Sequence, residues 1–254
     1  MELVFDIGNT HTVIGLHYQD RHFKIWRTGT RSFESEDELF VQLYTWFQYS
    51  GIQAGDIDRL GVASVVPSVN YMLTKLGQKY FHTDTLFVNP KSRIFDIEYR
   101  VDYPQEIGAD RLANVIAAKK EYGDNVIAID FGTAITIDVV QHGNFTGGAI
   151  LPGFSTAMLA LFSNTAQLPQ VELYIPEHSV GINTADNIQI GILKIPILGI
   201  ECLVEQIKAE TGTPYMIVCT GGTGKLLQGR SDLFQHYDPD LTLKGICYFL
   251  HHAQ

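Results

Sequence analysis

An aspartate–glycine turn occurs twice in the chain, each time directly after an apolar stretch. Asp6-Ile7-Gly8-Asn9-Thr10 recurs as Asp130-Phe131-Gly132-Thr133-Ala134. A strand that ends in Asp-x-Gly and turns into another strand can point backbone N–H groups at a phosphate, because glycine permits the conformation and a close approach. The aspartate can hold a cation or its water shell beside the phosphates. A single turn of this kind is more often an ordinary hairpin, whereas two copies favour a nucleotide site.

A third glycine-rich segment, Thr220–Gly222, follows the apolar stretch 216–219. Paired glycines leave no side chain in the way of a flat ring or a ribose, although an ordinary strand-to-helix connection has the same composition. The segment is not a Walker A loop, because Cys219 stands where that loop needs glycine and Leu226 stands where it needs Ser or Thr. It also lacks the G-x-G-x-x-G pattern of a Rossmann dinucleotide site.

Asp110 and Arg111 are adjacent at the expected start of a helix. A neighbouring arginine can hold a carboxylate ionised, which suits a general base that works at neutral pH. The alternative is a surface ion pair at a helix N-terminus, where an acidic residue interacts favourably with the helix dipole. The residues alone leave both interpretations open. Glu106 is interpreted as a solvated charge.

The elements that must position these residues alternate between strand and helix patterns. Strands are expected at 3–6, 12–18, 23–27, 60–66, 86–89, 126–130, 134–140, 145–150 and 216–219. Helices are expected from a capping box at Ser35–Glu38 onward and at 69–81, 109–121, 156–162, 185–210 and 243–251. Pro196 should bend or break the long helix 185–210.

The repeated turn predicts an α/β fold of two related halves, each a mixed sheet with flanking helices, around a central cleft. The expected boundary separates residues 1–123 from 124–254, and the final helix is expected to pack back on the first half.

Composition narrows the classes of partner. The formal net charge of −10 argues against nucleic acid, which is bound through basic surfaces. An acidic protein that binds ATP must rely on backbone N–H groups, a local cation or a metal.

No apolar run approaches the ~18 residues of a membrane span and the start lacks signal-peptide features, so a cytoplasmic protein is expected. Cys202, Cys219 and Cys247 are expected to be buried thiols, and the scattered histidines show no zinc cluster.

The order of the motifs resembles the type III pantothenate kinase family, and more broadly the ATPase domain of actin, hexokinases and sugar kinases. The family's Asp-Ile-Gly-Asn-Thr, Gly-Ala-Asp-Arg, Asp-Phe-Gly-Thr, Gly-Gly-x-Ile-x-Pro-Gly and Thr-Gly-Gly motifs correspond here to Asp6–Thr10, Gly108–Arg111, Asp130–Thr133, Gly147–Gly153 and Thr220–Gly222. The resemblance covers nearly the whole chain. It implies ATP-dependent phosphorylation of pantothenate to 4′-phosphopantothenate, the first step of coenzyme A biosynthesis.

The resemblance also implies roles for single residues. The ATP-binding residues would be Asp6, Ile7, Gly8, Asn9, Thr10, His11, Thr12, Val13, Thr133, Thr220, Gly221 and Gly222. Pantothenate would contact Gly108, Ala109, Asp110, Arg111 and Thr184, with Asp110 accepting the proton of the hydroxyl. Asp130 would bind a monovalent cation, K⁺ or NH₄⁺, and Asp6 would hold Mg²⁺ directly or through water.

One position departs from the family pattern. Many members carry a substrate-binding tyrosine seven residues before Gly108, where this chain has Val101, and Tyr103 is the candidate replacement. The family is dimeric with an acceptor pocket shared between subunits, so a homodimer is expected. Two alternatives are a non-enzymatic transcription accessory factor of the same family and an actin-like or chaperone-like ATPase. Intact aspartates at 6, 110 and 130 disfavour the first, and the short chain disfavours the second.

Overall fold

The computed structural model of the protein describes residues 1–18, 22–92 and 94–252. Its strands form two five-stranded sheets. The first contains β1 (Glu2–Ile7), β2 (His11–Tyr18), β3 (His22–Gly29), β4 (Arg59–Ser64) and β5 (Thr85–Phe87), in the order β3-β2-β1-β4-β5. The second contains β6 (Val126–Phe131), β7 (Ala134–Gln141), β8 (Asn144–Pro152), β9 (Met216–Thr220) and β10 (His236–Tyr237), in the order β10-β9-β6-β7-β8.

The two sheets have the same topology. In each, the first three strands pair antiparallel as successive hairpins, the fourth strand pairs parallel with the first, and the fifth pairs parallel with the fourth. Parallel neighbours require crossover connections, which explains why helices follow β3 and β8 before the chain returns to the sheet. The internal repeat expected from the duplicated turn is therefore confirmed, and it extends over both sheets. The short strand β10 was not predicted, because two residues carry no periodic signal.

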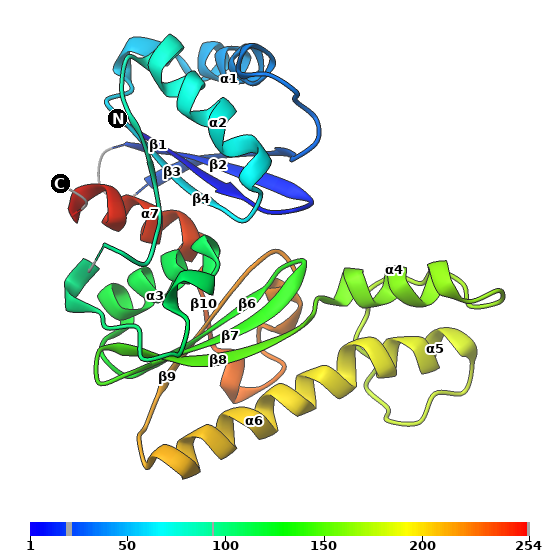
Figure 1. The fold of residues 1–254 in the computed structure, drawn as a ribbon. Helices are drawn as coiled ribbons and strands as arrows, with labels where there is room; N and C mark the ends of the chain where they lie inside the picture. Colours follow the sequence, from blue (N-terminus) through cyan, green and yellow to red (C-terminus); the bar gives the residue numbers. More distant parts are fainter. Residues whose placement is uncertain (19–21, 93, 253–254) are drawn as a thin grey trace.

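Seven α-helices accompany the sheets in the described residues. They are α1 (Glu36–Ser50), α2 (Pro67–Leu76), α3 (Ala109–Tyr122), α4 (Phe154–Asn164), α5 (Thr184–Gln189), α6 (Ile195–Thr211) and α7 (Leu241–His252). Helices α3 and α7 lie between the two sheets, whereas α4, α5 and α6 form a lobe that extends from the second sheet (Figure 1). A Cβ on Gly245 of α7 would lie 1.9 Å from the carbonyl oxygen of Ala113 in α3, so this close helix contact requires glycine.

Helix α7 also packs on the first sheet. A Cβ on Gly61 in β4 would meet the side chains of Ile246 and Leu250 at 2.6–2.9 Å, so the absence of a side chain there lets the helix approach the strand. A buried cluster joins residues of β1, β4, β6, α3 and α7. The final helix therefore contributes to the core on both sides.

Three local expectations need correction. Ser35 caps α1 by accepting from the N–H of Glu38 at 3.3 Å, but the Glu38 carboxylate accepts from the N–H of Glu34 at 2.7 Å, so the reciprocal half of the capping box does not form. Pro196 lies in the first turn of α6 and does not break the helix, because a π-helical turn at Ile190–Lys194 precedes it. Cys202 is exposed, whereas Cys219 and Cys247 are buried as expected.

The helical run Thr184–Thr211 is long and apolar enough to cross a membrane by length and composition alone. The expectation that no segment reaches this length is wrong, because polar residues such as Lys194 interrupt the apolar run in the sequence but the helix continues through them. Its buried residues, among them Ile192, Leu193 and Val204, belong to the core cluster of the second sheet.

Candidate active site

Asp6 lies near the carboxyl end of β1, the central strand of the first sheet. Strand β1 is held on both sides, with Asp6 opposite Val13 of β2 and Ala63 of β4. The turn after it closes through a 3.0 Å hydrogen bond from the N–H of Gly8 to the carbonyl oxygen of His11. The hydroxyl of Thr30, just after β3, donates to the carbonyl oxygen of Gly8 at 2.6 Å, and this hydrogen bond holds the turn in place.

The residues of the first turn differ in what they offer a ligand. Asn9, Thr10 and His11 are exposed, and Gly8 and Val13 are partly exposed. Ile7 is fully buried in the core of the first half. The side chain of Thr12 is also fully buried, and its hydroxyl is 3.0 Å from that of Thr30. The side chains of Ile7 and Thr12 therefore support the turn from inside the fold.

Asp130 occupies the matching position at the end of β6. The turn that follows closes through a 3.1 Å bond from the N–H of Gly132 to the carbonyl oxygen of Ala134. The side-chain amide of Asn114 in α3 donates to Asp130 at 3.0 Å, and the hydroxyl of Thr242 in α7 donates to the other end of that amide at 2.7 Å. Burial raises the pKa of Asp130 to about 6, with the Asn114 bond opposing the shift.

The segment Thr220–Gly222 lies directly against the second turn. Gly221 has φ +85°, and a Cβ there would lie 2.4 Å from Oδ1 of Asp130, so both the conformation and the contact require glycine. The hydroxyl of Thr223 donates to the carbonyl oxygen of Phe131 at 2.9 Å, which ties the segment to the turn. Thr220 is buried, whereas the hydroxyl-bearing residue Thr133 of the turn is exposed.

Asp110 lies in the first turn of α3. Its Oδ1 accepts from the backbone N–H of Arg111 at 2.8 Å, and a Cβ on Gly108 would lie 2.5 Å from the same oxygen. Burial raises the pKa of Asp110, and the backbone bond and positive charge of Arg111 oppose the shift. Asp110 is partly buried, so the interpretation as a surface ion pair does not describe it.

The guanidinium of Arg111 does not pair with Asp110. Its Nε and Nη2 donate to Oδ1 of Asp138 in β7 at 2.8 and 2.6 Å. Asp138 is only 1% exposed, and burial raises its pKa to about 7 against the lowering effect of Arg111. Arg111 therefore lowers the pKa of Asp110 through its charge and its backbone N–H, as expected, while its guanidinium ties α3 to the second sheet.

Asp6, Asp110 and Asp130 lie close enough to affect one another's ionisation. Burial, followed by the charges of Asp110 and Asp130, raises the pKa of Asp6 to about 8, and Arg27 opposes the shift. Arg27 in β3 also reaches the glycine segment, because a Cβ on Gly222 would lie 3.5 Å from its Nη1. The structure therefore brings both aspartate–glycine turns, the glycine segment and the start of α3 together.

Sequence reasoning missed Asp138 and Arg27. Both lie in strands next to an aspartate–glycine turn. Arg27 is the cross-strand partner of Val13, so the hairpin register is the signal that could have found it. Asp138 lies eight residues after Asp130 on the neighbouring strand, where an acidic residue inside an apolar stretch stands out.

Two predicted substrate residues are exposed to solvent. Thr184 is exposed at the first position of α5, and Figure 1 places α5 at the far end of the lobe, away from α3. Tyr103 is 61% exposed just before the short helix Pro104–Glu106, whereas Val101 packs against the core between the sheets. Glu106 is exposed, as expected for a solvated charge.

Comparisons with known proteins identify the family of the chain. A family model described as type III pantothenate kinase matches residues 2–206. The type III pantothenate kinase of Petrotoga mobilis is 54% identical over 249 residues, which cover 98% of this chain and 97% of the relative.

Solved structures show the fold. A Baf family transcriptional activator from Campylobacter jejuni aligns with a TM-score of 0.63 at 20% identity, over 99% of this chain and 98% of that one. A protein described as an N-acetylmannosamine kinase from Listeria monocytogenes aligns with a TM-score of 0.54 at 12% identity, over 100% and 99% of the two chains. The fold is thus the two-halved fold of actin-like ATPases and sugar kinases, and the chain belongs to the type III pantothenate kinase family.

Proposed function

We propose that this protein transfers the γ-phosphoryl group of ATP to the hydroxyl of pantothenate, giving 4′-phosphopantothenate in the first step of coenzyme A biosynthesis. The observation that carries the proposal is the convergence of Asp6, Asp110 and Asp130 from three separate elements on a frame of glycine turns. Family membership and the 54% identical relative named as a type III pantothenate kinase supply the acceptor. Phosphoryl transfer depends mainly on positioning and charge neutralisation, which such a frame provides.

The two aspartate–glycine turns are assigned to the triphosphate. Backbone N–H groups of Gly8–Thr10 and Gly132–Thr133 would contact phosphate oxygens, while Thr220–Gly222 leaves room for the nucleoside. These carboxylates fit cations. Burial and neighbouring charges raise the pKa of Asp6 to about 8, and a positive ion beside it would stabilise its ionised form. Asp6 would hold Mg²⁺, directly or through water, and Asp130 would hold K⁺ or NH₄⁺. The ions supply charge compensation for the phosphates.

Asp110 is assigned as the proton acceptor for the pantothenate hydroxyl. Its Oδ1 is held by the N–H of Arg111, which leaves Oδ2 to face the acceptor. The ion pair between Arg111 and Asp138 fixes the start of α3, so that the carboxylate is oriented before substrate binds. Gly108 and Ala109 would line the same pocket.

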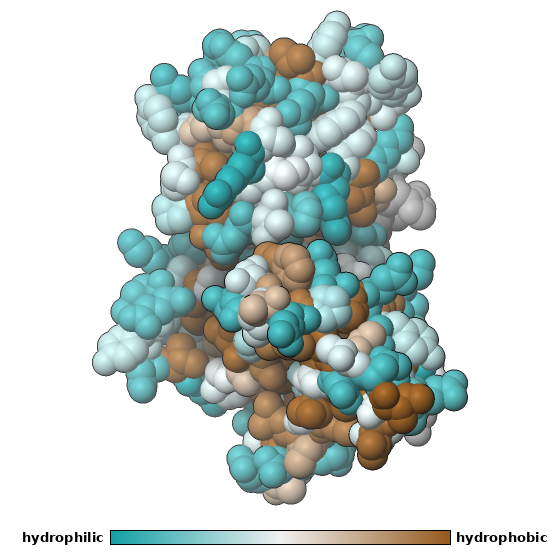
Figure 2. Space-filling model, turned by 90° about the vertical axis from the view of Figure 1, so that its right-hand side faces the viewer, coloured by the Kyte–Doolittle hydropathy of each residue, from teal (hydrophilic) through white to brown (hydrophobic). Residues whose placement is uncertain are grey.

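A homodimer would complete the acceptor site. Helix α5, which begins with Thr184, lies at the far end of the lobe from α3 (Figure 1), so Thr184 would contact pantothenate in the site of a second copy. Large apolar side chains are exposed on the lobe, and Figure 2 shows apolar residues gathered on that part of the surface. They include Leu159, Phe162, Ile195 and Leu198. An apolar face of this kind supports association with a second copy.

We assign the protein to the cytoplasm.

The test is turnover of Asp110→Asn at saturating pantothenate, paired with ATP binding and a thermal melt. Turnover should fall by about 10²–10⁴-fold, the usual contribution of a positioned general base, with folding and ATP binding retained. Glu106→Gln, an exposed carboxylate just before the same helix, is the matched control and should keep its turnover. Turnover of Asp110→Asn within a few-fold of the wild-type protein would rule out the assigned base. Absence of pantothenate-dependent ATP consumption in the wild-type protein would favour the transcription accessory factor.

A further inference from the structure

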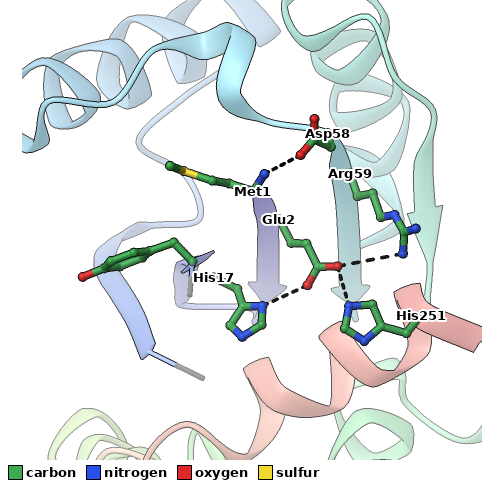
Figure 3. A pocket seen from close by; sticks show the side chains of 7 residues that line it. Met1, Glu2, His17, Asp58, Arg59 and His251 are labelled. Atoms are coloured by element: carbon green, nitrogen blue, oxygen red, sulfur yellow. Dashed lines mark hydrogen bonds and ion pairs between the residues drawn. The ribbon is translucent and has the colours of Figure 1, made fainter. Parts of the chain in front are cut away.

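A second polar cluster lies where β1 begins, at the other end of that strand from Asp6. It consists of Glu2, His17, Cys247 and His251, named here the Glu2 cluster. Figure 3 shows three of its members, Glu2, His17 and His251. Glu2 begins β1 and pairs in register with His17 of β2, while Cys247 and His251 are four residues apart on α7. Residues four apart share one face of a helix. Asp6 lies four residues after Glu2 on the same strand, and a rise of about 3.3 Å per residue puts the two ~13 Å apart.

Glu2, His17 and Cys247 offer ligand atoms that are close to one another, and His251 contacts Glu2. The two carboxylate oxygens of Glu2 are 3.0 Å from Nδ1 of His17 and 2.6 Å from Nε2 of His251. One carboxylate oxygen of Glu2, one ring nitrogen of His17 and the sulfur of Cys247 all lie within 4.8 Å of one another. A tetrahedral Zn²⁺ with bonds of about 2.0–2.3 Å holds its ligand atoms roughly 3.3–3.8 Å apart. A contraction of about 1 Å would therefore bring these three atoms into a first coordination shell.

The surroundings give a metal ion access from solvent. A cavity of about 990 Å³ is lined by Glu2, His17 and His251 of the cluster, together with Met1, Asp58 and Arg59. Arg59 is the competing positive group, with Nη1 4.0 Å from Glu2, but its side chain is 42% exposed and can turn toward solvent. The Met1 amino group is already paired with Asp58 at 2.5 Å.

We propose that the Glu2 cluster is a structural site for a divalent transition metal of the Zn²⁺ class, with Glu2, His17 and Cys247 as ligands and His251 as the fourth. Two imidazoles, a thiol and a carboxylate form a donor set that such ions prefer. Binding would replace the proton on the Cys247 sulfur, which leaves for solvent as the metal–thiolate bond forms. The site would join β1 and β2 to α7, and it takes no part in phosphoryl transfer.

The scattered histidines of the sequence gave no sign of this cluster. His17 and His251 stand 234 positions apart in the numbering, and both contact Glu2 because α7 packs on the first sheet. Burial, and then the nearby Glu2, raises the pKa of the Cys247 thiol. A bound cation would reverse that effect, because metal coordination deprotonates a thiol.

The experiment uses tag-free protein titrated with Co²⁺ and Zn²⁺. Co²⁺ should bind at one equivalent and give the thiolate-to-metal charge-transfer absorption of a cobalt–sulfur bond. Cys247→Ser should abolish this absorption, and Cys202→Ser, which removes an exposed thiol elsewhere, should keep it. Zn²⁺ at about one hundred times its dissociation constant should raise the melting temperature by about 5–10 °C, and a chelator should reverse the rise.

Variants that keep the thiol separate metal binding from folding. Glu2→Gln and His17→Ala should weaken Zn²⁺ binding, measured by equilibrium dialysis, at least tenfold relative to His236→Ala, an exposed histidine of β10. The proposal is overturned if Co²⁺ gives no thiolate absorption, or if Cys202→Ser removes the absorption and Cys247→Ser does not. Equal Zn²⁺ affinity in Glu2→Gln and the wild-type protein would show that Glu2 only accepts hydrogen bonds from the two histidines.

Discussion

Replacing Asp6 by asparagine should stabilise the unliganded protein while removing its function. The folded protein raises the pKa of Asp6 from its ordinary value of 3.8 to about 8, because the carboxyl is buried near Asp110 and Asp130. A raised folded-state pKa means that the fold prefers the protonated carboxyl. The stability from this preference is fully present below pH ~4 and is lost as the pH rises through about 8.

The size of the effect follows from the same values. Each tenfold change in an ionisation equilibrium corresponds to about 1.4 kcal/mol, so at pH 7 the raised pKa of Asp6 represents up to about 4 kcal/mol. Asp6 keeps partial contact with solvent, which screens its charge, and about 2 kcal/mol is the expected net effect. For a domain of this size, that difference shifts the melting temperature by about 4–8 °C. Asp6→Asn should therefore melt higher than the wild-type protein near pH 7.5, and the two should converge near pH 4.5.

The assay is a series of thermal melts between pH 4.5 and 8 without nucleotide, together with calorimetric titration of Mg²⁺ and ATP. Asp84→Asn, which removes an exposed carboxylate outside the site, is the control and should parallel the wild-type profile. Nucleotide binding by Asp6→Asn should be weakened in the same samples that melt higher. A melting temperature at pH 7.5 equal to or below that of the wild-type protein would refute the electrostatic reasoning.

Exchanging Na⁺ for K⁺ or NH₄⁺ should raise turnover, and Asp130→Asn should weaken that response; equal rates in the two buffers would count against a cation at Asp130. Gly245→Ala should lower the melting temperature, because its Cβ would lie 1.9 Å from the carbonyl oxygen of Ala113 and overpacking costs about 1–3 kcal/mol. Gly55→Ala, whose Cβ meets nothing within 4 Å, is the control in the same melts. Dilution should reduce pantothenate-dependent turnover before it changes the far-ultraviolet circular dichroism, since the acceptor site would lose its partner subunit; a fully active monomer in sedimentation would contradict this.

The parts of the fold that the sequence predicts are those encoded locally. Apolar stretches, each ended by an Asp-x-Gly turn, predict β1 and β6 and the repeat that relates them, because strand periodicity and turn chemistry act over a few residues. The same reasoning places Asp6 and Asp130 at strand ends. The resemblance to a known family adds Asp110, whose place in the first turn of α3 is as expected.

The contacts that sequence reasoning missed depend on how distant elements pack. Asn114 and Thr242 are 128 residues apart, and their hydrogen bond exists because Gly245 lets α7 approach α3. Arg111 turns to Asp138, 27 positions later, although Asp110 is its neighbour in the chain. A buried carboxylate on the facing strand attracts the guanidinium more strongly than a partly exposed one beside it, because less water competes for the charge. Which carboxylate an arginine pairs with can be predicted only once the burial of each candidate partner is known.

The cation requirement proposed for this site can be derived from its charges alone. The carboxyl groups of Asp6, Asp110 and Asp130 make the electrostatic potential more negative at the place where ATP would put its phosphates. The protein as a whole carries a formal net charge of −10. Arg27 is the cation that lowers the pKa of Asp6, while the charge of Arg111 is largely taken up by Asp138. Backbone N–H groups orient the phosphates but add no net charge. Cations that enter with the nucleotide would make the site attractive to ATP, and they would favour the ionised form of Asp6, whose pKa of about 8 otherwise keeps it mostly protonated at neutral pH.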